Sequence, residues 1–349
     1  MENIFSPPNQ AEEDPTAAER KKDHIDLAFR SQVTVDALDD RFYYEPLLSA
    51  HPSMDSWPTI DFLGKQLKAP LWVSSMTGGT EMAHTINHNL ARACREFGLG
   101  MGLGSCRSLL YSDDTLKDFD IRAIMGDEVP LFANLGIAQL EQLVERKEVY
   151  RISLLMNKLK ADGLIIHVNP FQEWLQPEGD LLKVTPLDTI KAILEQVEIQ
   201  VIVKEVGQGM GYRSLKALLQ LPLAAIDFAA NGGTNFAKLE LERSSEVEKE
   251  AYGQLAHIGH SATEMVNMVN ELITHLGTKR QCSQIIISGG IRHFLDGYYL
   301  IKKCNLPSIY GQASGFLKYA RGDYEQLRQY IATQIKGLAL ANAYLSIKA

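Results

Sequence analysis

The sequence predicts an α/β protein, a (β/α)8 TIM barrel with an N-terminal extension or lid and with a C-terminal helix. Eight short apolar runs rich in β-forming residues recur along the chain, and each ends in glycine or polar residues. Amphipathic helical stretches lie between them, and this alternation is typical of a parallel sheet buried on both faces. A barrel needs about 250 residues, so a chain of 349 leaves room for both terminal additions.

The chain begins with residues 1–19, which are rich in Pro, Glu, Asp and Ala and lack periodicity. This composition predicts a flexible extension. We expect residues 20–349 to form a single barrel domain. The domain starts with the charged, helix-spaced stretch "AERKKDHIDLAF", in which Ile25, Leu27 and Phe29 supply a narrow apolar face.

The predicted strands follow in order. They are "APLWVSSM", "LGMGLG", "PLFANLG", "GLIIHVN", "VIVKEVG", "AAIDFAA", "QIIISGG" and "SIYGQA". Helical stretches between them include "MAHTINHNLARACREFG", "LDTIKAILEQV" and "SATEMVNMVNELITHLG". The region 238–259 has no strand signal and predicts a long, mobile excursion after the sixth strand. A doubly wound open sheet is the alternative, but its phosphate-binding glycines would follow the first strand, whereas the glycine-rich turns here come late.

Composition excludes several classes of protein. Hydrophobic content of 45% and charged content of 22% are those of a globular chain. No apolar stretch is long enough to span a membrane, and the N-terminus lacks the order of a secretory signal. The 4 cysteines have no metal-ligand spacing, which predicts a reduced, cytoplasmic setting. A net charge of -8 argues against nucleic-acid binding but not against a small anionic ligand.

Polar residues close every predicted strand, and in a barrel these ends converge on one cavity. The glycine turns "SGGIR" and "GQASG" follow the seventh and eighth strands, where barrels commonly bind phosphate through backbone N–H groups. Close-packed turns would also need these glycines. Lys204 interrupts an apolar strand, which predicts an inward lysine with an anionic partner; an outward, snorkelling lysine is the alternative.

Taken together, "RKKDHI", "SSMTGGT", "GLGSCR", "FANLG", "HVNPFQEWLQPEGD", "VIVKEVG", "NGGTNF" and "SGGIR" closely resemble type 2 isopentenyl diphosphate isomerase. The resemblance runs from about Arg20 to the eighth strand. It implies an FMN-dependent barrel that interconverts isopentenyl and dimethylallyl diphosphate in isoprenoid biosynthesis. Cys106 departs from the family, which more often has Gln there, and Phe236 stands where an indole is common.

The resemblance also implies roles for single residues. The FMN contacts are expected from Ser75, Met76, Thr77, Ser105, Asn134, Lys204 and Thr234. The FMN phosphate is expected on Gly289, Gly290, Ile291, Arg292, Ala313 and Ser314. The residues expected to bind the substrate are Arg20, Lys21, Ser105, Arg107 and Gln172, the first four of them at its diphosphate. The residues expected beside the flavin in catalysis are His167, Asn169, Gln172 and Lys204. Glu173 matches the Mg²⁺ ligand.

The chemistry explains why such residues are needed. Moving a double bond adds a proton at one carbon and removes one from another, so positive charge develops on the way. A reduced flavin can stabilise that charge, and because no net redox change occurs, NAD(P)H needs to reduce it only once. A neutral amide is a poor general acid, so we expect Gln172 to orient and flavin N5 to exchange the proton, with His167 as the competing acid–base group. Glu173 either binds Mg²⁺ or favours a helix start. We also expect a homo-oligomer.

The alternative function is that of an FMN-dependent oxidoreductase of the hydroxy-acid oxidase type. That class shares the barrel, the lysine and the late phosphate site, and it uses a His–Arg pair after the seventh strand. Arg292 and His293 offer such a pair. The alternative leaves "HVNPFQE" and "RKKDH" without a role. A flavin-binding or phosphate-binding module without turnover is a third reading.

Overall fold

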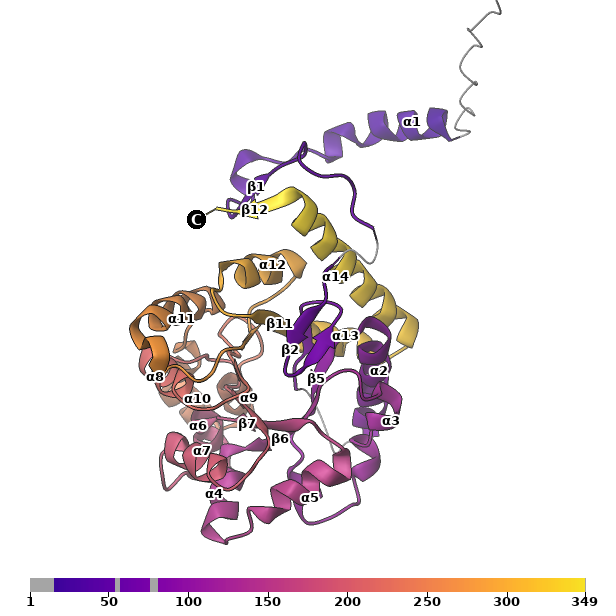
Figure 1. Cartoon of the computed structure of the whole chain (residues 1–349). Helices are drawn as coiled ribbons and strands as arrows, with labels where there is room; N and C mark the ends of the chain where they lie inside the picture. The colour runs from indigo at the N-terminus through magenta and orange to yellow at the C-terminus, as the bar shows by residue number, and fades with distance from the viewer. Residues whose placement is uncertain (1–15, 54–56, 76–80, 349) are drawn as a thin grey trace, which may run out of the picture. The chain divides into compact units, whose positions relative to one another are not determined.

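The computed structural model describes residues 16–53, 57–75 and 81–348 (Figure 1). The chain divides into two compact units. One unit contains the residues up to Tyr43 together with Lys348, and the other contains Tyr44–Ile347. The predicted domain boundary at residue 20 stays a prediction.

The second unit is built around a closed parallel barrel of eight strands in the order β10-β11-β4-β5-β6-β7-β8-β9. These strands are β4 (Leu71–Val73), β5 (Gly100–Gly102), β6 (Leu131–Gly136), β7 (Gly163–His167), β8 (Gln200–Lys204), β9 (Ala225–Asp227), β10 (Ile285–Ser288) and β11 (Ser308–Gln312). Each lies within one of the predicted runs, except that β8 begins one residue earlier, at Gln200. The (β/α)8 prediction is therefore confirmed, and the open-sheet alternative is wrong because β10 pairs with both β9 and β11.

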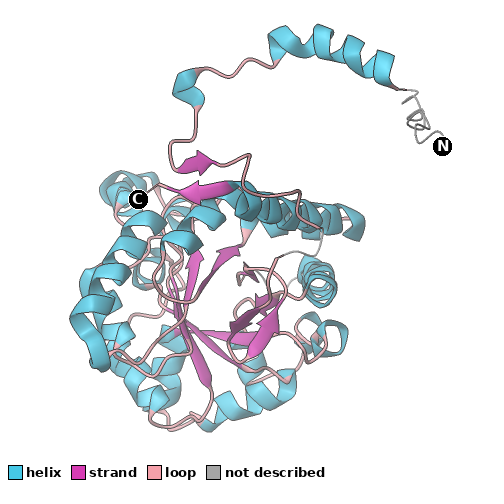
Figure 2. Cartoon of the chain, turned by 45° about the horizontal axis from the view of Figure 1, so that its top comes forward, coloured by secondary structure: helices cyan, strands magenta, loops and turns pink. Residues whose placement is uncertain are grey.

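Helices surround the strands (Figure 2). In this unit they are α2 (Glu81–Phe97), α3 (Arg122–Met125), α4 (Ile137–Glu145), α5 (Tyr150–Leu159), α6 (Pro170–Leu175), α7 (Pro186–Leu194), α8 (Tyr212–Leu219), α9 (Phe236–Arg243), α10 (Glu246–Tyr252), α11 (Ala262–Leu276), α12 (Phe294–Lys303), α13 (Ser314–Ala320) and α14 (Tyr324–Tyr344). The predicted C-terminal helix is α14. In the first unit, α1 (Ala17–Leu27) carries the basic stretch. Two short strands lie where the chain passes between the units: β1 (Phe42–Tyr44) begins in the first unit, and β12 (Leu345–Ile347) ends the second.

Inward side chains fill the barrel with a layer of large apolar groups. The cluster contains Trp72, Phe132, Ile165, Ile202, Ile286 and Ile309 from six different strands. Fully burying one such side chain stabilises the fold by about 1.5–3 kcal/mol. Because side chains alternate along a strand, the residue two positions after Ile202, which is Lys204, faces the same way.

A hairpin that the sequence did not predict closes the amino-terminal end of the barrel. Its strands are β2 (Ile60–Phe62) and β3 (Lys65–Leu67), joined through Leu63 and Gly64. Both turn residues have positive φ, as a two-residue hairpin turn requires. Phe62 and Leu67 belong to the apolar barrel cluster. The catalytic chemistry must therefore be sought at the opposite, carboxyl end.

The region 238–259 contains no strand, as expected, and is largely helical; its mobility stays a prediction. Asn235 is the N-cap of helix α9, and its side chain accepts from the backbone N–H of Lys238. Helix α10 starts with a capping box between Ser245 and Glu248. Such caps supply partners for N–H groups that a helix start otherwise leaves open. The helical structure matters because α9 contributes Glu240 to the candidate site.

Among the residues that the structure describes, no helix is both long enough and apolar enough to cross a membrane.

Candidate active site

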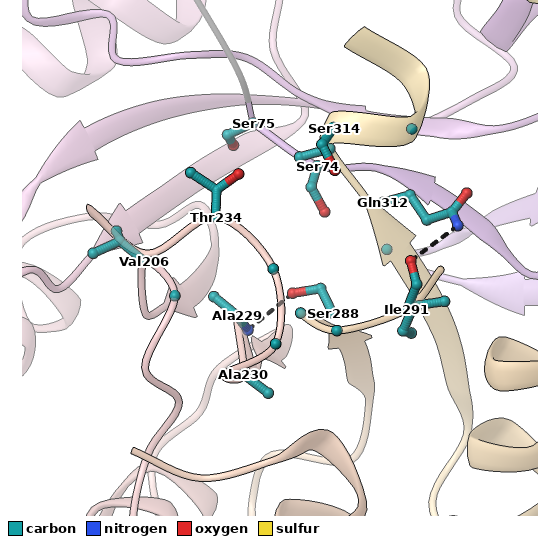
Figure 3. Close-up of a pocket in the computed structure, with 18 of the residues that line it drawn as sticks. Ser74, Ser75, Val206, Ala229, Ala230, Thr234, Ser288, Ile291, Gln312 and Ser314 are labelled. Atoms are coloured by element: carbon teal, nitrogen blue, oxygen red, sulfur yellow. Dashed lines mark hydrogen bonds between the residues drawn. The ribbon is translucent and has the colours of Figure 1, made fainter. Parts of the chain in front are cut away.

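A cavity of about 320 Å³ opens at the carboxyl ends of the barrel strands (Figure 3). Its walls come from the segments that follow β4, β8, β9, β10 and β11. The sequence-predicted cofactor residues that line it are Ser75, Lys204, Thr234, Gly289, Gly290, Ile291, Arg292, Ala313 and Ser314. The fold thus brings together residues from five separate stretches of sequence.

Two serine hydroxyls of this wall have no hydrogen-bond partner within the described part of the chain. They are Oγ of Ser74 and Oγ of Ser75, and both atoms are buried. Ser74, Ser75 and Thr234 lie around the same opening in Figure 3. Buried polar atoms in native proteins are almost always hydrogen-bonded, so these hydroxyls indicate a polar ligand in the cavity.

Glycines let the loops after β9 and β10 approach each other across this cavity. Gly289 and Gly290 have φ of 88° and 70°. A Cβ on Gly289 would lie 2.0 Å from the carbonyl oxygen of Ala230, and a Cβ on Gly232 would lie 3.0 Å from Cα of Gly290. No side chain fits at these positions. The wall here is backbone, which suits the close approach of a phosphate group.

Lys204 points into the cavity wall, as predicted, and is buried. Its Nζ donates to the carbonyl oxygen of Glu205 at 2.7 Å. In the sheet register Lys204 pairs with His167 on one side and with Asp227 on the other. Asp227 is completely buried, and burial raises the pKa of its carboxyl, while Lys204 opposes that shift. Lys204 therefore places a cation at the edge of the buried apolar cluster that fills the barrel.

His167 is held by Asn134. The Nδ2 of Asn134 donates to the carbonyl oxygen of Leu103 at 3.0 Å, so its Oδ1 is left to accept from Nδ1 of His167 at 2.8 Å. This arrangement assigns the proton of a neutral imidazole to Nδ1. Burial, reinforced by the positive charge of Lys204, lowers the pKa of His167 to about 3. The ring is therefore neutral at pH 7 and has no imidazolium proton to give.

This pKa predicts how stability depends on pH. Between about pH 6.5 and pH 3 the unfolded chain binds a proton at residue 167 that the folded chain does not. The free energy of unfolding should therefore fall as the pH drops through this window, by up to about 1.4 kcal/mol per pH unit. We expect urea unfolding at pH 7.5 and at pH 5 to show a smaller loss for His167→Gln than for the parent. Equal losses would mean that His167 is not buried in its neutral form.

A second cavity of about 260 Å³ adjoins the first and shares Val206 with it. Its wall includes Asn169 and Gln172, which lie at the start of α6 directly after β7. Nδ2 of Asn169 donates both to Oε1 of Gln172 at 3.0 Å and to Oε1 of Glu173 at 2.9 Å. Within the segment "HVNPFQE", Asn169, Gln172 and Glu173 therefore form one hydrogen-bonded group beside the Lys204 cavity.

The amide of Gln172 is fixed at both of its ends. Its Oε1 accepts from Asn169, and its Nε2 donates to Oε1 of Glu240 at 3.2 Å. Glu240 is buried, and its Oε2 accepts from Nη1 of Arg243 at 2.6 Å. A group held in this way can orient a reactant, because its rotation would break both bonds.

Glu173 has one partner on each carboxylate oxygen. Oε1 accepts from Asn169, and Oε2 accepts from the backbone N–H of Asp180 at 2.8 Å. Nη2 of Arg107 lies 3.0 Å from Oδ2 of Asp180, which brings Arg107 next to this segment. No group of three or more His, Cys, Asp or Glu side chains in residues 16–53, 57–75 and 81–348 could by itself hold a metal ion. A metal at Glu173 would need ligands from a substrate and from water.

Other predicted residues lie apart from the Lys204 cavity or outside the described residues. Ser105 is exposed, and Asn134 reaches the site only through His167. Arg20 and Lys21 lie on α1, in the first unit. Met76 and Thr77 lie outside the residues that the structure describes. Cys106 is buried, and its Sγ donates to the carbonyl oxygen of Gly104 at 3.4 Å.

Sequence reasoning missed Glu240 and Gln312. Glu240 belongs to an acidic and basic run that resembles any solvated helix, and only its contact with Gln172, 68 positions earlier, distinguishes it. Gln312 ends β11 and lines the cavity. A polar residue at the end of a barrel strand is the signal that identified the other candidate site residues, and the same signal could have identified Gln312.

No family model matches the chain. Among curated proteins, the isopentenyl-diphosphate delta-isomerase of Rickettsia typhi is 32% identical over 343 residues and covers 97% of each chain. That of Rickettsia felis is 34% identical over 327 residues, covering 92% of this chain and 91% of its own.

Solved structures with the same fold include mandelate oxidases. One with a monooxide FMN adduct has a TM-score of 0.52 at 15% identity and covers 88% of each chain. Another, with benzoyl-formic acid, has a TM-score of 0.55 at 16% identity and covers 88% of this chain and 86% of its own. This likeness supports the barrel architecture and nothing finer. The full-length sequence relatives decide the family, and the chain belongs to the isopentenyl-diphosphate delta-isomerases.

Proposed function

We propose that this protein interconverts isopentenyl and dimethylallyl diphosphate with reduced FMN, as the type 2 enzymes of isoprenoid biosynthesis do. The relatives at 32–34% identity supply the reaction. One observation carries the FMN dependence. A glycine- and serine-lined cavity containing a buried lysine adjoins a second cavity lined by the fixed amides of Asn169 and Gln172.

The residues that line the first cavity fit FMN. The unpartnered hydroxyls of Ser74 and Ser75 can bond to polar atoms of a flavin, and the glycine loops leave space for its phosphate. Thr234 adds a third hydroxyl to the same wall. Bound and reduced, FMN would supply an electron-rich ring that stabilises positive charge and an N5 that exchanges a proton. Lys204 supplies the positive charge that favours an anionic, reduced ring.

The protein's own groups then orient the substrate. Gln172 is fixed by Asn169 and Glu240, so it positions the reacting carbons or a water rather than donating a proton. His167 is neutral and offers Nε2 only as an acceptor. Glu173 would hold Mg²⁺ through its carboxylate, with substrate diphosphate oxygens and water as the other ligands. Arg107 and Ser105 would bind the same diphosphate.

The N-terminal cations complete this proposal. Arg20 and Lys21 would close over the substrate diphosphate, because charge-assisted hydrogen bonds to phosphate can order a basic segment. We expect Arg20→Ala and Lys21→Ala to raise KM for isopentenyl diphosphate about tenfold each, the effect of one lost charged hydrogen bond. FMN affinity should not change.

Lys22→Ala is the matched control, since it removes a charge from the same basic stretch of α1. Steady-state kinetics with saturating Mg²⁺ gives KM, and flavin fluorescence gives the FMN Kd. A loss of FMN affinity with an unaltered KM would reassign the pair to the cofactor.

We also propose a cytoplasmic homo-oligomer that takes its electrons from NAD(P)H. The 4 cysteines are all free and buried, which agrees with a reducing compartment. Large apolar side chains between residues 25 and 48 are strongly exposed, among them Phe29 at 83%, Val35 at 85% and Leu47 at 93%. Several large apolar side chains exposed so close together in the sequence favour contact with another copy of the chain.

Purified protein loaded with FMN tests the function. We expect no turnover of isopentenyl diphosphate while the flavin is oxidised, and turnover after anaerobic reduction by NADPH. Robust isomerisation by oxidised enzyme would contradict the proposal. For the hydroxy-acid oxidase alternative, mandelate or lactate would have to reduce the flavin. Arg292 lines the first cavity, but His293 lines neither cavity, is half-exposed and has its Nε2 3.6 Å from Oδ1 of Asp296, which argues against that alternative.

A further inference from the structure

The long C-terminal helix reaches the first cavity through a chain of two hydrogen bonds. On α14, the hydroxyl of Tyr330 donates to Oε1 of Gln312 at 3.2 Å. Nε2 of Gln312 in turn donates to the carbonyl oxygen of Ile291 at 3.3 Å, and this bond is drawn in Figure 3. Gln312 is only 5% exposed. The amide therefore cannot exchange these partners for bulk water.

The peptide unit between Ile291 and Arg292 is held from both sides. Its carbonyl accepts from Gln312, and its N–H donates to Oδ2 of Asp296 at 3.0 Å. In a trans peptide the C=O and N–H bonds point in opposite directions, so these two partners fix the rotation of the whole unit. The carbonyl oxygen is turned to an N–H donor, which reduces the repulsion that it would exert on an anion in the cavity.

Tyr330 also contacts the beginning of α13. A Cβ on Gly315 would lie 2.6 Å from the Tyr330 hydroxyl oxygen, so only glycine leaves room for that hydroxyl. The ring of Tyr330 stacks on Tyr319 with centroids 4.7 Å apart and meets Phe316 edge-on at 6.0 Å. The tyrosine is thus a rigid point between the two loops that follow β10 and β11.

These two loops follow the seventh and eighth strands of the barrel, where barrels commonly bind phosphate. Ile291, Gln312 and Gly315 all line the first cavity. On the basis of the proposed function, we propose that Gln312 and Tyr330 are positioning residues for the phosphate of FMN. They set the peptide after Ile291 and thereby the preference for FMN over riboflavin, which has the same ring but no phosphate.

The experiment compares the Kd values of FMN and riboflavin by quenching of flavin fluorescence. Gln312→Leu keeps the bulk but removes both bonds, and it should weaken FMN binding about tenfold while riboflavin binding is unchanged. Tyr330→Phe keeps the ring stack and should weaken FMN binding about threefold, again without an effect on riboflavin. Tyr319→Phe is the matched control, because it keeps the stacked ring and leaves the Tyr330 hydroxyl in place; neither Kd should change.

A fall in both affinities by the same factor would overturn the inference, since the aromatic cluster would then only support the fold. Unchanged affinities in both variants would also overturn it. The parent protein tests the underlying function separately. If the parent binds riboflavin as tightly as FMN, the proposed FMN site itself is wrong, whatever the variants do.

Discussion

Enzyme saturated with FMN should lose roughly 10²- to 10³-fold in kcat when Lys204 is replaced by alanine, the effect of removing one preorganised electrostatic group from an active site. Lys204 is buried in the cavity wall, and His167 and Asp227 flank it in register. Solvent therefore cannot replace its charge. The loss should appear in kcat because, in the proposed mechanism, the charge acts on the reduced ring and not on substrate binding.

Two further variants separate charge from packing. Lys204→Met keeps the length of the side chain and should lose as much as the alanine variant, whereas Lys204→Arg should retain part of the activity. The measurement is anaerobic turnover at saturating isopentenyl diphosphate, with flavin occupancy read from the absorbance of each variant. Full activity in a flavin-loaded Lys204→Met would show that the charge has no catalytic role.

Gln172 and Glu173 should fail in different ways. Gln172→Leu should lower kcat about 10²-fold, the effect of a reactant misplaced by about 1 Å, because both bonds that fix the amide are lost. Its dependence on Mg²⁺ should stay that of the parent. Glu173→Gln should instead shift the Mg²⁺ titration to higher concentration and raise KM for the diphosphate, because a neutral amide is a poor ligand for Mg²⁺.

Glu173 needs a second variant because its carboxylate accepts two hydrogen bonds inside the protein. An amide can keep only one of them, so Glu173→Gln also disturbs the start of α6. Glu173→Asp retains the charge, so its Mg²⁺ titration should shift less than that of Glu173→Gln. A parental Mg²⁺ curve and kcat in Glu173→Gln would reduce Glu173 to a residue that holds the loop before Asp180.

The sequence predicted the barrel because its strands are buried on both faces and therefore appear as uninterrupted apolar runs. It predicted that Lys204 points inward because a charged residue inside an apolar strand usually faces an anionic partner. It did not predict the β2–β3 hairpin, whose strands are each three residues long. Strands this short carry too few alternations for a period to be recognised.

Contacts between distant segments account for what else was missed in the site. Glu240 fixes Gln172 across 68 positions, and Lys65 pairs with Asp162 across 97. The local sequence around Glu240, Lys65 and Asp162 does not differ from that around an ordinary exposed charged residue. The resemblance to a family supplied the roles of residues such as Glu173, whose position at a helix start permits two explanations.

Turnover in D₂O separates isomerisation from oxidation. Enzyme reduced with NADPH is incubated with isopentenyl diphosphate in D₂O without oxygen, while NMR follows the carbon skeleton and absorbance follows the flavin. We expect dimethylallyl diphosphate carrying deuterium at the newly formed methyl group, over many turnovers, with the flavin still reduced at the end. Product formation that oxidises one flavin per turnover, or no product from fully reduced, FMN-loaded enzyme, would contradict this expectation.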